Sequence, residues 1–332
     1  YPLAMLKTLS PQQWALMELR HAADLPILGK CYAAFAPLSA GWLDFRSELH
    51  MTHDKDLFLE RATPSALPLY EGKMIWQYQH WFNTAQYWLE PAAFDARLHS
   101  KELYRMAQDL EVPKSEVSKY ADAVRFDHEF VRLAFRVIAR DTDERTLIFT
   151  LLPQKCATGH SMFATVPKHY ALSSSATTTE KQKQHVTVQP VSYLRLLFAL
   201  AWFNSLPMDW LARFMVQINV SQTYLYRLPM PQPSDEEILQ NPDYQALAKN
   251  ALLLTLAASW DDFAIPLAPQ IKALGIAKKD LPTTAKAQDK LRADIDQRVA
   301  RLYGLQPTDL AHMLASFKVM ANKRPEYFTL FQ

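Results

Sequence analysis

Five residues between positions 132 and 146 have side chains suited to contacting nucleic acid. Arg132, Arg136 and Arg140 recur at intervals of four, and Arg145-Thr146 follows a short acidic turn. A strand alternates its side chains between two faces, so an interval of four places all three arginines on one face. Guanidinium forks bind phosphate oxygens or the major-groove edge of guanine. The row therefore predicts a DNA-facing surface.

Acidic residues beside this row leave a second interpretation open. Residues 125–155 hold six basic and five acidic side chains, a net charge of +1. In this interpretation the arginines form ion pairs inside the domain and do not contact DNA. The acidic residues concerned are Asp127, Glu129, Asp141, Asp143 and Glu144.

A second pattern is similar to the carboxylate set of metal-dependent nucleases. Asp54 or Asp56 precedes Glu71-Gly72-Lys73 in the sequence. Two carboxylates could hold Mg²⁺ while Lys73 assists the attacking water. A nuclease that uses Asp56, Glu71 and Lys73 is therefore one alternative function.

Charged stretches elsewhere allow either DNA contact or protein docking. Residues 270–301 carry eight basic and four acidic side chains, and residues 232–262 carry six acidic side chains and one basic. The basic stretch could follow a phosphate backbone, and binding would then weaken with salt. Alternatively, the two stretches are complementary docking surfaces for other subunits. The basic loop at 155–185, of which 173–185 is a polar stretch, carries Lys155, Lys168, Lys181 and Lys183 and is a further candidate for DNA contact.

Composition excludes several classes of site. Only six glycines occur in 332 residues, and no two lie within ten residues of each other. Phosphate loops, dinucleotide fingerprints and methyl-donor sites need clustered glycines, so any cofactor would bind another domain. The two cysteines and ten histidines lack the spacing of metal motifs. We predict no cofactor, no metal ligand and no catalytic residue in this chain.

Periodicity and helix breakers predict an α+β fold that runs from helical to β-rich to helical. Ser234 and Glu237 form a capping box, and Pro307 begins a last short helix. The aromatic stretch from Trp76 to Trp88 is interpreted as core, and stacking of its rings on a flipped base or a single strand is the alternative. Strands are predicted at 130–140, 146–152, 161–166 and 223–228, and helices at 1–36, 97–111, 192–206, 209–217 and 287–302.

This order divides the chain into three segments. Residues 1–125 are a helical and loop region, 126–233 a β-rich domain, and 234–332 a helical region. No apolar run approaches the roughly 20 residues of a membrane span, so no membrane partner is expected. The scarcity of cysteine favours a cytoplasmic protein. The sequence begins at Tyr1 and not at Met, and we expect it to be part of a longer chain.

Several stretches match, in order, motifs of one family. They are residues 68–75, 132–136, 140–148, 151–153, 203–205, 209–213, 225–231 and 299–305. The most distinctive are Arg140-Asp141-Thr142-Asp143-Glu144-Arg145-Thr146, Phe203-Asn204-Ser205 and Asp209-Trp210-Leu211-Ala212-Arg213. Together they resemble the large single-chain N6-adenine DNA methyltransferases of restriction–modification and phage-defence systems, of type IIG/IIL-like, PglX-like and DISARM-like kinds.

In that family this region follows the catalytic domain and carries target recognition. The catalytic Asn/Asp-Pro-Pro-Tyr/Phe tetrapeptide and the glycine-containing methyl-donor motif are absent here, and Asp143 stands where the family more often has Asn. The resemblance implies that residues 126–233 are a target-recognition domain that reads a short double-stranded DNA sequence. A catalytic domain of the same polypeptide would use S-adenosylmethionine to methylate one adenine.

The arginine row and the resemblance together define the residues expected to face DNA. This set is Arg132, Arg136, Arg140, Arg145, Thr146, Lys73 and Arg227. A protein-interaction module that docks other subunits, and the Mg²⁺-dependent nuclease, remain the alternatives.

Overall fold

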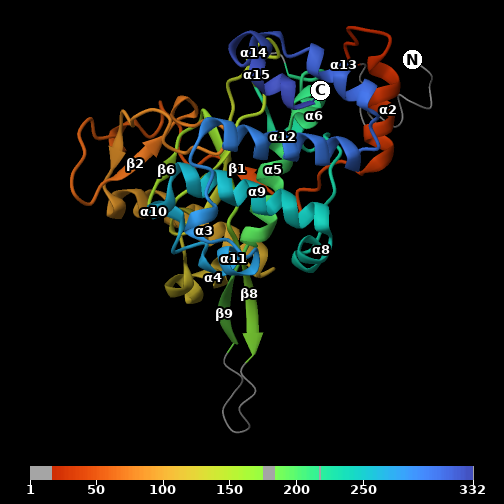
Figure 1. The fold of residues 1–332 in the computed structure, drawn as a ribbon. Coiled ribbons are helices and arrows are strands. Elements are labelled where there is room, and N and C mark those ends of the chain that lie inside the picture. The colour runs from red at the N-terminus through yellow and green to blue at the C-terminus, as the bar shows by residue number, and fades with distance from the viewer. Residues whose placement is uncertain (1–16, 175–183, 217, 332) are drawn as a thin grey trace.

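The computed structural model describes residues 17–174, 184–216 and 218–331. It contains 49% helix and 14% strand, which confirms the predicted α+β class. Figure 1 shows the short strands in the first part of the chain and the helices of the last part beside them.

A four-stranded antiparallel sheet has the strand order β1-β7-β4-β5. Its strands are β1 (Phe45–Arg46), β4 (Arg132–Arg136), β5 (Phe149–Leu152) and β7 (Met162–Thr165). The three predicted strands at 130–140, 146–152 and 161–166 are confirmed, each shorter than expected. Four of the five residues of β4 are buried. A strand open to water on one face alternates buried and exposed residues, so this sheet is covered on both faces.

A smaller sheet of order β3-β2-β6 joins the N-terminal region to the central sheet. β2 (Leu67–Tyr70) pairs antiparallel with β3 (Trp88–Leu89) and parallel with β6 (Ala157–Thr158). The helical elements of this region are α2 (Asp24–Ala34), η1 (Lys55–Leu57), η2 (Gly72–Met74), α3 (Pro91–Asp109), α4 (Lys114–Val117), η3 (Ser118–Ala123) and η4 (Asp127–Glu129). The predicted helix at 97–111 is α3, and the predicted start of the first helix lies outside the described residues.

β8 (Lys168–Ser174) and β9 (Gln184–Pro190) form a two-stranded antiparallel ribbon that projects from the body (Figure 1). The ribbon base is anchored by the Tyr170 hydroxyl, which accepts from the backbone N–H of Arg125 and donates to its carbonyl, both at 3.0 Å. The prediction of a polar loop at 173–185 is wrong for residues 173–174, which belong to β8, and for residues 184–185, which belong to β9. Residues 175–183 lie outside the described residues.

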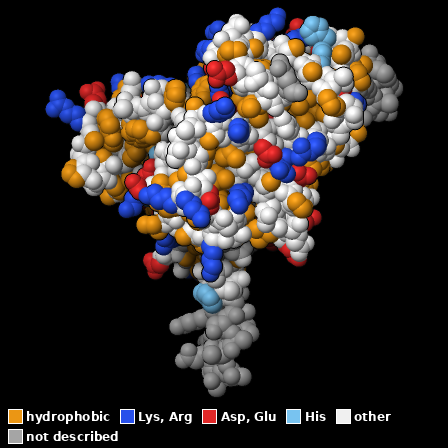
Figure 2. All heavy atoms as spheres, viewed as in Figure 1, with side chains coloured by type: hydrophobic (Ala, Val, Ile, Leu, Met, Phe, Trp, Pro, Cys, Tyr) orange, Lys and Arg blue, Asp and Glu red, His pale blue; other side chains and the backbone are white. Residues whose placement is uncertain are grey.

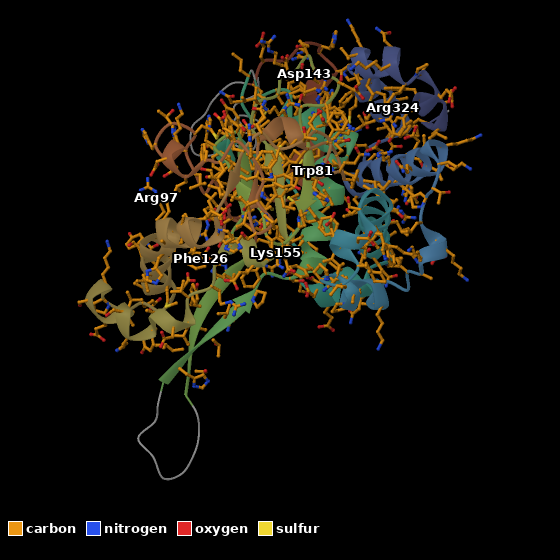
Figure 3. All side chains as sticks on the ribbon, turned by 90° about the vertical axis from the view of Figure 1, so that its left-hand side faces the viewer. Trp81, Arg97, Phe126, Asp143, Lys155 and Arg324 are labelled. Carbon is orange, nitrogen blue, oxygen red and sulfur yellow. The ribbon has the colours of Figure 1, made fainter. Side chains whose placement is uncertain are left out.

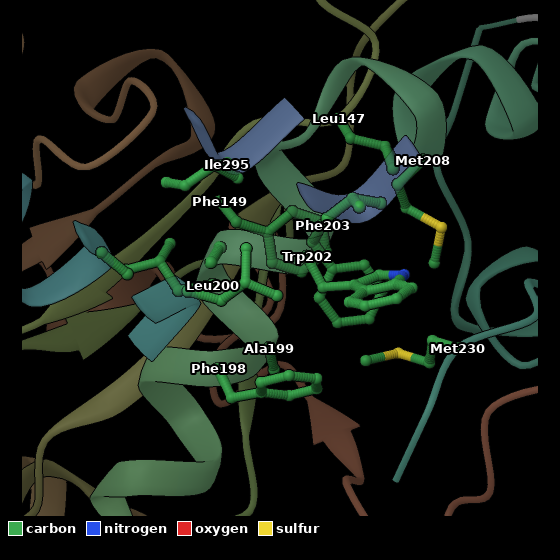
Figure 4. Close-up of a cluster of buried hydrophobic side chains, with 14 of the residues drawn as sticks. Leu147, Phe149, Phe198, Ala199, Leu200, Trp202, Phe203, Met208, Met230 and Ile295 are labelled. Carbon is green, nitrogen blue, oxygen red and sulfur yellow. The ribbon is translucent and has the colours of Figure 1, made fainter. Parts of the chain in front are cut away.

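Helices dominate the C-terminal third. α5 (Tyr193–Asn204) is buried along most of its length and packs on α9 (Pro242–Ala258). Figure 4 shows the core that they share with β5, where Phe149 and Phe203 stack with ring centroids 4.3 Å apart. The remaining elements are α6 (Leu206–Ala212), α7 (Gln222–Leu225), α8 (Asp235–Gln240), α10 (Trp260–Phe263), α11 (Ala268–Ala273), η5 (Lys278–Asp280), α12 (Ala285–Leu302), α13 (Pro307–Ala315), α14 (Lys318–Lys323), α15 (Pro325–Phe328) and η6 (Thr329–Phe331).

The predicted helix ends of this third are confirmed. Ser234 and Glu237 form the capping box of α8. α12 stops before Gly304, whose φ of +71° lies in the left-handed region that favours glycine. Pro307 is the first residue of α13.

The predicted strand at 223–228 is wrong, since α7 occupies its first half. The Ser221 hydroxyl accepts from the backbone N–H of Tyr224 and so caps this helical turn. A local cap of this kind outweighs the β propensity of the residues that follow.

One core cluster includes buried residues from all three predicted segments, among them Leu28, Phe135 and Val299. The predicted boundaries, after residues 125 and 233, both fall between helices. The division into three segments therefore stays a prediction.

Candidate nucleic-acid interface

The structure places Arg132 in the interior. Its side chain is fully buried in β4, where Nη1 lies 2.9 Å from Oε1 of Glu48. Its Nη2 also donates to the carbonyl of Cys156 at 2.5 Å. Glu48 in turn accepts from the backbone N–H of Thr158 at 2.8 Å. A side chain in these contacts cannot reach DNA, so Arg132 leaves the DNA-facing set.

Arg145 and Thr146 are also interior residues, and both contact Asp209. The Arg145 Nε donates to Oδ2 of Asp209 at 2.8 Å, and the Thr146 backbone N–H donates to the same oxygen at 3.1 Å. The Nε of Arg213 donates to the other carboxylate oxygen at 2.9 Å. We call these four residues the Asp209 hub. The hub removes Arg145 and Thr146 from the DNA-facing set.

Charge compensation keeps the hub carboxylate ionised. Burial by itself raises the pKa of Asp209, but Arg145 and Arg213 together hold it below its ordinary value. A buried carboxylate with two arginine partners and backbone donors is fully satisfied. The family-like stretches at 140–148 and 209–213 therefore meet inside the protein.

Arg136 and Arg140 lie where β4 ends and leaves the core. Arg136 is half-buried and Arg140, beyond the strand, is exposed. Lys73 is exposed on η2, which packs against this end of the sheet. A Cβ on Gly72 would lie 2.7 Å from the carbonyl oxygen of Ser161 and 3.0 Å from Cγ of Arg136. Glycine at this position therefore permits the close approach of η2 to Arg136.

Three cavities that share lining residues follow the turn after β4, and we call them together the sheet-end groove. The first, of about 330 Å³, contains Arg136 and shares Thr142 and Asp143 with the second. The second, of about 590 Å³, shares Arg213 with the third, of about 380 Å³, which contains Arg227. The groove thus brings together Arg136 and Arg227, which are far apart in the sequence.

Helices α13 and α14 form the opposite wall of the groove. They contribute His312 and Lys318 to the second cavity and Lys323 to the first. His312 donates to Asp24 across 2.7 Å. Burial tends to raise the pKa of Asp24, but the hydrogen bonds from His312 and from the backbone N–H groups of His21 and Arg20 together hold it below its ordinary value. Lys318 could not be predicted as a groove residue, because the residues around it in the sequence do not indicate that α14 faces the turn after β4.

The cations of the groove fall into two groups. Arg20 pairs with Asp141, Arg213 with Asp209, and Lys323 with Glu144. Within the described part of the chain, Arg136, Arg227 and Lys318 line the groove without an ion-pair partner. These three are the cations of the groove that can pair with an external anion.

The turn that carries Asp143 is held in place by its own hydrogen bonds. The Asp143 carboxylate accepts from the backbone N–H of Arg140 at 2.9 Å, and the Thr146 hydroxyl donates to the Arg140 carbonyl at 3.0 Å. Figure 3 shows Asp143 at the top of the molecule, on the same side as Arg324. The turn therefore uses a side-chain oxygen at position 143 as a hydrogen-bond acceptor.

The nuclease candidates are held by other contacts. The Asp54 carboxylate is bound by Arg97 at 2.5 Å, and Asp56 is exposed on η1. Glu71 pairs with Lys73 at 3.3 Å. Among the residues that the structure describes, no three His, Cys, Asp or Glu side chains are grouped so as to hold a metal ion.

The two charged C-terminal stretches pair partly with each other. Asp243 accepts from Arg298 at 2.6 Å and from Arg301 at 3.4 Å. Exposed lysines remain on the basic stretch, and Figure 2 shows charges of both signs interspersed over the face in view. The exposed lysines are Lys272, Lys278, Lys279, Lys286 and Lys290.

No family model and no curated protein matches this sequence. Among solved structures, the chain is similar to the Type IIL restriction-modification enzyme MmeI in complex with DNA, with 10% sequence identity and a TM-score of 0.35. The match covers 87% of this chain and 35% of that enzyme, so the chain spans about a third of its length. Over the described residues, none of the helices combines the length and the apolar character that crossing a membrane requires.

Proposed function

We propose that this chain docks on double-stranded DNA through the sheet-end groove. The observation that carries the proposal is the position of three unpaired cations, Arg136, Arg227 and Lys318, along one groove. Guanidinium groups bind phosphate and guanine edges with fixed geometry, and a lysine adds a flexible contact to phosphate. Arg140 on the exposed turn and Lys73 on η2 extend this cationic surface.

In this proposal the chain is the target-recognition part of an N6-adenine DNA methyltransferase of a restriction or phage-defence system. The family-like motifs support it, because they build the Asp209 hub from which the groove turn projects. The residues present do not fit a methyl-donor site, since six isolated glycines cannot form a glycine-rich loop. S-adenosylmethionine would therefore bind a catalytic domain outside this sequence.

Protein docking is the second candidate, and one observation favours it. The middle cavity of the groove is lined by Trp210, Phe214 and Val319. An apolar floor between charged ends is typical of a surface that receives another protein segment.

The test is a selection from randomised duplex DNA with the full chain, followed by binding measurements across a salt series. We expect an enriched short motif, and affinity that falls steeply with salt. Each of Arg136→Ala, Arg227→Ala and Lys318→Ala should reduce the slope of log K against log salt by about one if it removes a phosphate contact. Relaxed specificity at one base position would identify a base-reading arginine.

Lys55→Ala is the matched control, because Lys55 is an exposed lysine of η1 that lies outside the three cavities of the groove and outside the basic stretch at 270–301. It should leave both the affinity and the salt slope unchanged. Absence of binding at low salt, or equal effects of the control and the groove variants, would refute DNA docking through this groove.

A further inference from the structure

A second, separate cavity lies where three distant parts of the chain meet. It measures about 690 Å³ and is lined by the segment between β2 and Trp81, by the turn at 153–156, and by residues around α10. Figure 3 shows Trp81 and Lys155 in the middle of the molecule, on the side that faces the viewer. The volume lies in the range of small-molecule sites, roughly 300–1,000 Å³.

A buried hydrogen-bond relay forms one wall of this cavity. The Tyr70 hydroxyl lies 2.7 Å from Nδ1 of His80, and Nε2 of His80 lies 3.0 Å from Oδ2 of Asp262. Burial lowers the pKa of His80, and Asp262 only partly opposes this. A neutral imidazole that donates from Nε2 to the carboxylate accepts at Nδ1 from the tyrosine hydroxyl. The relay thus fixes Asp262, whose side chain is half-exposed, as a hydrogen-bond acceptor at the cavity.

Trp81 supplies an aromatic surface beside this acceptor. Its side chain is 46% exposed although it is large and apolar. The indole meets Tyr70 edge to face, with centroids 5.5 Å apart and planes at 67°, and is tilted against His80. This leaves ring surface available for stacking with a planar ligand.

Lys155, on the turn at 153–156, supplies a cation to the same cavity. Its φ of +60° is unusual for a residue with a side chain, and its backbone N–H donates to the carbonyl of His128 at 2.7 Å. Its ammonium group is exposed and has no ion-pair partner among the residues that the structure describes. Unfavourable backbone conformations of this kind cluster at ligand sites, because the surrounding structure must hold them in place.

We propose that this cavity binds a single nucleotide, with the base on Trp81, its exocyclic amine on Asp262 and its phosphate on Lys155. A planar stacking surface, a fixed acceptor and an unpaired cation together match a ligand with a flat ring, a donor and an anionic group. The carboxylate selects adenine, cytosine or guanine, since thymine and uracil have no exocyclic amine. The proposal does not depend on DNA docking in the sheet-end groove.

The test is calorimetric titration of the full chain with dAMP, dCMP, dTMP and the nucleoside deoxyadenosine. We expect dAMP and dCMP to bind about tenfold more tightly than dTMP, as one lost hydrogen bond to a charged group predicts. Trp81→Ala should abolish binding. Asp262→Asn should remove the preference against dTMP, and Lys155→Gln should make dAMP and deoxyadenosine bind equally.

Lys119→Gln is the control, because Lys119 is an exposed lysine of η3 that does not line this cavity. Unfolding curves of each variant separate lost binding from lost folding. A trinucleotide that binds more tightly than dAMP would identify the ligand as part of a single strand, and equal or weaker binding would identify it as a free nucleotide. No binding of any nucleotide at millimolar concentration, or variants that all behave as the control does, would overturn the proposal.

Discussion

Individual ion pairs explain why two of the five arginines predicted to face DNA are not at the surface. Arg132 and Arg145 each hold a buried carboxylate, Glu48 and Asp209 respectively. A third interior group joins Asp127 to Arg46 at 2.5 Å and to Lys168 at 2.8 Å. Removing one partner of such a pair leaves the other charge unpaired in the interior, which typically costs about 3–5 kcal/mol. Arg132 and Arg145 therefore contribute to the stability of the fold.

Asp296 is a buried carboxylate whose pKa is raised, whereas that of Asp209 is lowered. Burial raises the pKa of Asp296 to about 6, although Arg145 and the Tyr327 hydroxyl partly offset this. Between the ordinary pKa of about 3.9 and the folded value, the folded state binds the proton more tightly than the unfolded state. Stability should therefore increase as the pH falls from 7 to about 4.

We expect Asp296→Asn to remove this pH dependence. The largest possible contribution of one proton is about 1.4 kcal/mol per pH unit. Urea unfolding of both proteins between pH 4 and pH 7 measures it, with the exposed Asp56→Asn as control. Parallel stability curves for the wild type and Asp296→Asn would contradict the assignment.

The partners of these arginines could not be predicted from sequence. The arginine row itself is visible, but Asp209 follows Arg145 by 64 residues. The prediction of a DNA-facing surface assumed that one face of β4 is open to solvent. Both faces of β4 are covered, so the shared face of the arginines is buried. Arg136 and Arg140 stay accessible because β4 ends there, and strand ends are poorly defined by residue pattern.

At the scale of elements, the ribbon of β8 and β9 has a packed base and an open end. Tyr170 and the partly buried Val186 and Val188 belong to a cluster with α3 and α4. Beyond the paired residues Leu172 and Val186, the ribbon extends away from the body (Figure 1). The distal strands therefore contribute little to the stability of the whole.

We expect replacement of residues 173–185 by Asn-Gly to change the free energy of unfolding by less than about 0.5 kcal/mol, since Leu172 and Val186 are register partners that a two-residue turn can join. Urea denaturation is the measurement. A loss of more than about 1 kcal/mol would mean that the distal ribbon packs on the body. The same variant shows whether DNA affinity uses the ribbon.

Elements with strong periodicity and clear caps agree with prediction, and polar or short ones do not. α12 carries a continuous apolar stripe with a glycine stop, and both are visible in the sequence. The ribbon is rich in Ser, Thr, Gln and His, which indicate a loop, and its pairing is made between strands and not by local propensity.

Over the whole molecule, one core connects the central sheet to the C-terminal helices. Trp202 of α5 is fully buried, and its indole N–H lies 3.1 Å from the Tyr303 hydroxyl just after α12. The segment 126–233 contains α5 but not the helices that cover it. The α+β class of the whole chain could be predicted from the order of the expected helices and strands. The packing of α5 against the C-terminal helices could not, because it depends on contacts between residues that are distant in the sequence.

We expect residues 126–233 to show no cooperative unfolding when expressed alone, because the buried face of α5 would be open to water. Near-ultraviolet circular dichroism during a urea titration compares this fragment with the full chain, which should unfold in one transition. A cooperative transition of the fragment would establish it as an independent domain.

The Asp209 hub lies in the interior of the protein. The residues of the hub are therefore different from the exposed residues of the groove that a bound molecule would contact. The hub side chains that belong to the family-like motifs are buried and bonded within the protein, although Arg213 and Arg145 also form part of the walls of the groove. Exchange of the exposed residues of the sheet-end groove would leave the hub intact. Under the proposed function, proteins that share these motifs could differ in the bases that they select, and a designer could vary the exposed residues of the groove without rebuilding the frame that supports it.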